Sequence, residues 1–98
     1  MGSSLKSAQF LVDSRIADAA RGDIDALYDL GVSYSTGTSG VTIDLIEAHK
    51  WFNLAAVSGL EEAQACRAEV AEDMTARQVA TAQAAARAWL SLTQRRAA

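Results

Sequence analysis

The stretch from Gly22 to Gly59 constrains the fold more than any other part of the 98-residue chain. Its sequence, GDIDALYDLGVSYSTGTSGVTIDLIEAHKWFNLAAVSG, predicts a helix, a glycine-rich turn and a second helix. Small residues recur where the two helices would face each other, and small residues let helix backbones approach closely. Large apolar side chains between them would fill the remaining volume. We therefore expect a helical hairpin at the centre of the fold.

Two faces of this hairpin have different expected roles. Gly31 inside a helix costs about 1 kcal/mol relative to Ala, so we expect a neighbouring helix to cross there. The expected core of the hairpin consists of Ala26, Leu30, Gly31, Tyr34, Ala48, Trp51, Ala55 and Ala56. The opposite side of the first hairpin helix is not needed for packing and is free for other contacts; it carries Asp25, Tyr28, Asp29 and Val32.

Composition and length indicate a single all-α domain. The chain has no Pro and is rich in Ala, and 98 residues suffice for one core. Periodicity predicts five helices, over residues 5–21, 24–35, 45–57, 60–72 and 76–94. The first would pack through Leu5, Ala8, Val12, Ile16 and Ala19, which lie along one side of it.

Caps and turns set the expected helix boundaries. Ser3 or Ser4 would cap the first helix and Asp23 the second, while Gly22 and Gly59 would end helices with a positive φ. Residues 36–43 form the expected turn, with positive φ at its two glycines, Gly37 and Gly40. Capping boxes open the third helix, at Asp44 and Glu47, and the last helix, at Thr75 and Gln78.

The charge is unevenly distributed along the chain. The net charge is −3, and all 12 acidic residues lie at or before Asp73. The remaining residues contain four arginines and no acid. A net acidic chain argues against nucleic acid as a ligand, whereas the charge asymmetry favours either a charged protein partner or head-to-tail association of two copies.

No residue pattern predicts catalysis, a metal site or a cofactor. Cys66 is the only cysteine, so the chain has no internal disulfide, and we expect a small buried apolar side chain rather than a reactive thiol. His49, the only histidine, has no catalytic partner in sequence and is expected at the surface. The glycine-rich turn lacks the Lys of a phosphate-binding loop. Without a signal peptide or an apolar membrane segment, the expected location is the cytoplasm.

One spacing recurs along the chain. Gly22 and Ala26 are matched by Gly59 and Ala63, 37 residues later, a period that suits a helix-turn-helix repeat. A longer set of positions resembles the Sel1-like repeat, a relative of the tetratricopeptide repeat: Gly22, Ala26, Leu30, Gly31, Tyr34, Gly37, Gly40, Val41, Asp44, Ala48, Trp51, Ala55, Ala56, Gly59 and Ala63. The tail, MTARQVATAQAAARAWL, resembles the closing helix of small bacterial proteins of that family.

The resemblance implies an organisation and a function. Residues 22–58 would be one full repeat, residues 1–21 a capping helix, and residues 59–98 a degenerate second unit with a C-terminal capping helix. Leu-Gly and Tyr are missing from the second unit, near Arg67, Ala68 and Ala71. Sel1-like proteins are scaffolds or adaptors, often in signalling, without a shared active site. The expected function is therefore protein–protein interaction without catalysis.

Two binding surfaces follow as alternatives. In the first, Asp25, Tyr28, Asp29 and Val32 bind a peptide or helix of an unidentified partner, and the acidic residues favour a basic one. This interpretation takes Tyr28 as spared from the core. In the second, a homodimer forms through Trp89, Leu90 and Leu92 as an exposed patch on the basic last helix; otherwise Trp89 anchors that helix on the domain.

Overall fold

The computed structural model describes residues 3–97, with side chains for residues 9–94. The described residues form five α-helices and no strand: α1 (Ser3–Ala20), α2 (Ile24–Thr36), α3 (Leu45–Val57), α4 (Glu61–Ala71) and α5 (Ala76–Ala97). The predicted all-α class and number of helices are confirmed. The observed boundaries differ from the predicted ones by a few residues. Helix α5 continues beyond Gln94, and α1 already includes Ser3 and ends before Arg21.

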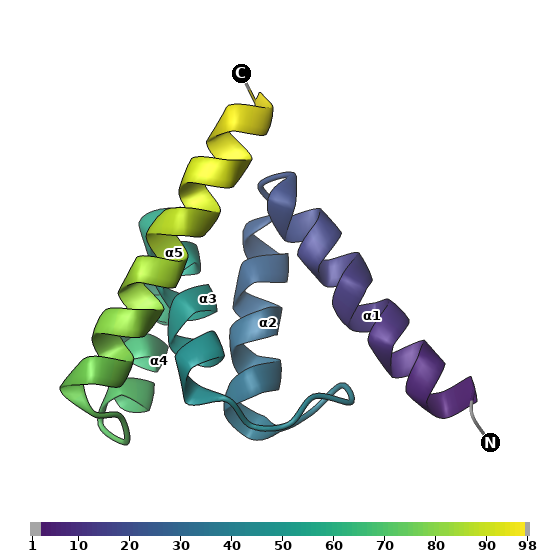
Figure 1. Ribbon diagram of the computed structural model, residues 1–98, viewed down its shortest axis with the longest axis horizontal. Coiled ribbons are helices and arrows are strands. Elements are labelled where there is room, and N and C mark those ends of the chain that lie inside the picture. The colour runs from purple at the N-terminus through teal and green to yellow at the C-terminus, as the bar shows by residue number, and fades with distance from the viewer. Residues whose placement is uncertain (1–2, 98) are drawn as a thin grey trace.

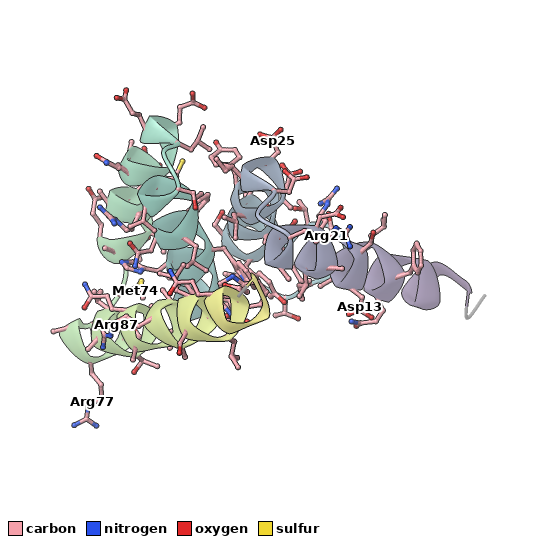
Figure 2. All side chains as sticks on the ribbon, turned by 90° about the horizontal axis from the view of Figure 1, so that it is seen from above. Asp13, Arg21, Asp25, Met74, Arg77 and Arg87 are labelled. Atoms are coloured by element: carbon pink, nitrogen blue, oxygen red, sulfur yellow. The ribbon has the colours of Figure 1, made fainter. Side chains whose placement is uncertain are left out.

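Helix α3 lies at the centre of the molecule. It packs against α2, α4 and α5, whereas α1 packs against α2. In Figure 1, α1 and α5 form the two arms of a V, and α2 and α3 lie between them. Figure 2, seen from above, shows α5 along the lower side of the picture and α1 at the height of the lower ends of α2 and α3. We call the side of the molecule that faces the viewer in Figure 1 the open side of the V.

The contact between α2 and α3 depends on Gly31. A Cβ atom added at Gly31 would lie 2.5 Å from Cδ1 of Phe52, closer than real Cβ atoms approach. Phe52 is itself buried, so its ring fills the space above the glycine. Ala48 and Ala55 of α3 are also fully buried. The prediction that a neighbouring helix crosses at Gly31 is confirmed.

The two turns that precede α2 and α4 have the same geometry. Gly22 and Gly59 both adopt positive φ, +93° and +114°. After α1, the amides of Gly22 and Asp23 donate to the carbonyls of Ala19 and Asp18. The equivalent bonds after α3, 37 residues later, join Gly59 to Ala56 and Leu60 to Ala55. Both helices thus end in the same left-handed glycine cap, which satisfies their last carbonyl groups.

The expected caps of α2 and α5 form, the capping box of α3 forms only in half, and Ser3 and Ser4 lie inside α1 rather than at its N-cap. The Asp23 carboxylate accepts a bond from the Ala26 amide, and Thr75 and Gln78 form the reciprocal pair of a capping box. Asp44 accepts a bond from the Glu47 amide, but Glu47 does not return one. Its carboxylate lies 2.7 Å from the Lys50 ammonium instead. The Asp44 amide donates to the carbonyl of Tyr34 near the end of α2, so this carbonyl takes the place of the Glu47 side chain as the acceptor.

The prediction that His49 lies at the surface is wrong. Its exposed fraction is 3%, and its imidazole Nδ1 is buried without a hydrogen-bond partner among the described atoms. Burial, and then the nearby guanidinium of Arg67 on α4, lowers the pKa of His49. Because α3 is covered by three helices, positions beside its main apolar stripe are buried as well.

Candidate functional site

An acidic face surrounds Tyr28 on the side of α2 that approaches α4. We use the name acidic face for Asp25, Tyr28 and Asp29 of α2 together with Glu62 of α4. Asp25 and Asp29 are exposed and lie one helical turn apart, and Glu62 is exposed in the first turn of α4. Figure 2 shows Asp25 on the upper side of the picture, away from the open side of the V. The acidic face and the V are therefore separate surfaces.

Tyr28 joins α2 to both α3 and α4. Its ring is tilted against the Phe52 ring, with 5.7 Å between the ring centroids. Its hydroxyl forms a hydrogen bond at 3.8 Å with the thiol of Cys66. The premise that Tyr28 is spared from the core is therefore wrong: the side chain is half-buried and packs against the core. What remains available to a partner is the part of the ring and hydroxyl that is still exposed.

The electrostatics at Tyr28 are those of an acidic surface. The pKa of its hydroxyl is raised first by the contact with the Cys66 thiol, then by burial, and then by the carboxylates of Glu62 and Asp29. Within residues 9–94 the ion pairs are Arg21 with Asp18 and Lys50 with Glu47. None of the carboxylates on the acidic face is thus neutralised by a described basic side chain.

Val32 extends this surface along α2 only in part. It is half-buried and packs against the core, and its carbonyl accepts bonds from the hydroxyls of Ser35 and Thr36. Of the four residues predicted to bind a partner, Asp25 and Asp29 are exposed, while Tyr28 and Val32 present only part of their surface. The fold brings Glu62 and Cys66 to the same place, which the sequence did not indicate.

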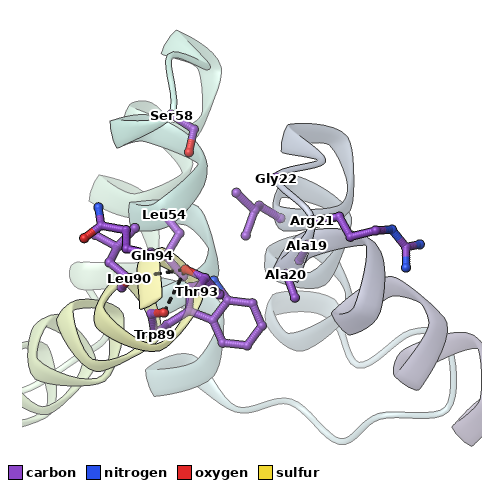
Figure 3. A pocket seen from close by; sticks show the side chains of 11 residues that line it. Ala19, Ala20, Arg21, Gly22, Leu54, Ser58, Trp89, Leu90, Thr93 and Gln94 are labelled. Atoms are coloured by element: carbon purple, nitrogen blue, oxygen red, sulfur yellow. Dashed lines mark hydrogen bonds between the residues drawn. The ribbon is translucent and has the colours of Figure 1, made fainter. Parts of the chain in front are cut away.

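A second feature is a cleft of about 220 Å³ between the α1–α2 turn and the C-terminal half of α5. It is lined largely by apolar groups, and its wall on α5 carries Trp89, Leu90 and Thr93. Figure 3 shows the Trp89 indole pointing from α5 toward Ala20 at the end of α1. The Thr93 hydroxyl donates to the carbonyls of Trp89 and Leu90, so it is satisfied within α5, and the other polar side chain on this wall is the exposed Gln94.

The three residues predicted as an exposed patch on α5 do not lie together on the surface. Trp89 and Leu90 are half-buried and pack against the core. The Trp89 ring meets Trp51 edge to face, with 4.8 Å between the centroids and an interplanar angle of 75°. Leu92 is 61% exposed and stands beside a smaller hollow next to the cleft, lined by Ala20, Trp89 and Thr93 as well. The geometry is that of an anchor at Trp89 and an exposed apolar side chain at Leu92.

The residues predicted as the hairpin core lie between α2 and its neighbours. Ala26, Leu30, Gly31, Ala48, Trp51 and Ala55 are buried, while Tyr34 and Ala56 are half-buried. Among the described residues, no group of three or more His, Cys, Asp or Glu side chains is arranged to hold a metal ion. His49 is buried on α3 near Arg67 of α4, and it is not among the groups that shift the pKa of Tyr28.

Comparisons with known proteins do not identify the chain. No family model, no curated protein and no solved structure matches it. The resemblance to the Sel1-like repeat therefore stays a prediction. In the described part of the chain, no helix combines the length and the apolar character that crossing a membrane requires.

Proposed function

We propose that this chain is a protein-interaction module that binds a basic helix or extended peptide on the acidic face, without catalysis. The observation that carries the proposal is a set of three carboxylates, of Asp25, Asp29 and Glu62, around the half-buried Tyr28. No basic side chain within residues 9–94 forms an ion pair with any of them. Interfaces favour this combination because the aromatic ring gives contact area and the charges select and steer the partner.

The packing contacts that hold the acidic face in place support this function. Tyr28 is held by the Phe52 ring and the Cys66 thiol, so it loses little conformational freedom when a partner binds. The helix that carries it is fixed by the close contact at Gly31. A preorganised surface of this kind binds with a smaller entropic cost than a flexible one.

The scaffold also supports a Sel1-like adaptor as the finer description. The glycine caps at Gly22 and Gly59 share their hydrogen bonds at an offset of 37 residues, and each is followed by a buried alanine, Ala26 and Ala63. In stacked helical hairpins, equivalent turns recur in this way and neighbouring first helices together form a binding surface. Here those first helices would be α2 and α4, which carry the acidic face.

Charge-neutralising variants test the proposal. The probe is a panel of amphipathic peptides with Lys or Arg at four-residue spacing, and binding is followed by fluorescence anisotropy at low salt. The variant combines Asp25→Asn, Asp29→Asn and Glu62→Gln. We expect its affinity for the best peptide to fall by about tenfold or more, because three favourable charges are lost.

A matched control separates local charge from net charge. The control combines Glu69→Gln, Glu72→Gln and Asp73→Asn, three exposed acids in the last turn of α4 and directly after it. It changes the net charge by the same amount and should leave the affinity nearly unchanged. Equal losses in both triple variants, or no binding of any basic peptide by the unmodified chain, would contradict the proposed site.

A further inference from the structure

The cleft between α1 and α5 combines an apolar receiving surface with an exposed apolar side chain on its rim. Leu92 is 61% exposed, although it lies next to the half-buried Trp89 and beside the hollow that Trp89 and Ala20 line. An apolar side chain next to an apolar recess suits an interface with two-fold symmetry, because each copy then supplies both the side chain and the recess. This observation is independent of the acidic face.

The charge distribution of the chain favours a second copy of it as the partner that docks at the cleft. α5 carries arginines and no acidic residue, and Arg77 and Arg87 make no ion pair within the described residues. Carboxylates gather around Tyr34 at the end of α2. The pKa of the Tyr34 hydroxyl is raised first by burial and then by the carboxylates of Glu47, Asp44 and Asp13. Glu47 is paired with Lys50, so Asp44 and Asp13 are the two without an ion pair within residues 9–94. A basic α5 and unpaired carboxylates elsewhere in the same chain are complementary between two copies.

The shape of the molecule allows both contacts at once. Asp13 on α1 and Arg77 on α5 point to the same lower side of Figure 2, the open side of the V. If two copies meet there about an axis through the cleft, α5 of each copy lies along α1 of the other. We propose that a second copy of this chain docks in this way, with Leu92 of each copy inserted in the cleft of the other.

The solution mass of the full chain tests the proposal. Light scattering over a wide concentration range should show a monomer–dimer equilibrium at low salt, and high salt should weaken it because the arginine–carboxylate contacts are screened. Leu92→Gln should raise the dissociation constant by about tenfold or more. Ala20→Gln, which fills the cleft from the side of α1, should do the same. Circular dichroism verifies that both variants retain the helices.

Val57→Gln provides the control, because Val57 is similarly exposed at 64% but lies at the end of α3. This variant should dimerise like the unmodified chain. A monomer at every concentration overturns the proposal. So does a dimer that is insensitive to Leu92→Gln and Ala20→Gln, or one that Val57→Gln disrupts equally. A dimer that high salt does not weaken overturns the pairing of α5 with the carboxylates of the other copy.

Discussion

Replacing Gly31 with Ala should destabilise the protein, although Ala is the better helix former. In an exposed helix this change would stabilise by about 1 kcal/mol. Here the added methyl group would lie 2.5–2.9 Å from three atoms of the Phe52 ring. That ring is buried and is already in contact with Tyr28, so it has little room to move. Overpacking of this kind costs about 3 kcal/mol at the upper end of its usual range.

The expected net loss for Gly31→Ala is therefore about 2 kcal/mol, the overpacking cost less the gain in helix propensity. For a domain of this size that loss lowers Tm by roughly 8–16 °C. Urea unfolding followed by circular dichroism measures the free energy directly. Phe52→Leu should create room, so the double variant Gly31→Ala/Phe52→Leu should lose less than the sum of the two single losses. A Gly31→Ala variant as stable as the unmodified chain, or more stable, would refute the reasoning.

Three further predictions follow from burial, packing and capping. Burial, and then Arg67, lowers the pKa of His49, so the unfolded chain binds the proton more tightly. The free energy of unfolding should therefore fall as the pH drops below about 6.5, level off below the folded-state pKa, and lose this step in His49→Gln; urea titrations at several pH values measure it. Tyr28→Phe keeps the ring packing and should change Tm little, whereas Tyr28→Ala should cost about 2 kcal/mol, because a half-buried ring contributes less than a fully buried one. Thr75→Ala should cost about 1 kcal/mol through loss of the N-cap of α5, and calorimetry would show the lower Tm; an unchanged value would contradict the capping role.

The hairpin could be predicted from sequence because its signals are local. The caps at Asp23 and Thr75 need only a side chain and an amide a few residues away. The left-handed turns at Gly22 and Gly59 likewise follow from single residues. The contact between α2 and α3 at Gly31 joins residues far apart in sequence, yet it could be predicted from sequence because a glycine inside a helix is costly without a packing reason.

The environment of His49 depends on how many helices cover α3. A periodic pattern predicts one buried face, whereas α3 packs against three helices and is buried on most of its circumference. Leu54, which lies outside the predicted packing face and is fully buried, was missed for the same reason. The signal was present in the sequence: the run from Trp51 to Val57 contains only one strongly polar residue, Asn53.

The two candidate surfaces depend on tertiary contacts that no local pattern specifies. Glu62 and Cys66 reach Tyr28 only because α4 returns beside α2. The cleft exists because the Trp89 ring packs on Trp51 and fixes the C-terminal half of α5 near the α1–α2 turn. Sequence reasoning identified Tyr28 and Trp89 as important aromatic residues but assigned too much free surface to each.

Mapping a bound basic peptide by amide chemical shifts tests the interaction-module account most directly. The full chain would be titrated with the tightest peptide of the Lys- and Arg-spaced panel, and shift changes would be assigned along the backbone. The account predicts that the largest changes cluster at Asp25, Tyr28, Asp29 and Glu62, with little change at Leu92. Changes confined to the V and α5, or no saturable change anywhere, would contradict it.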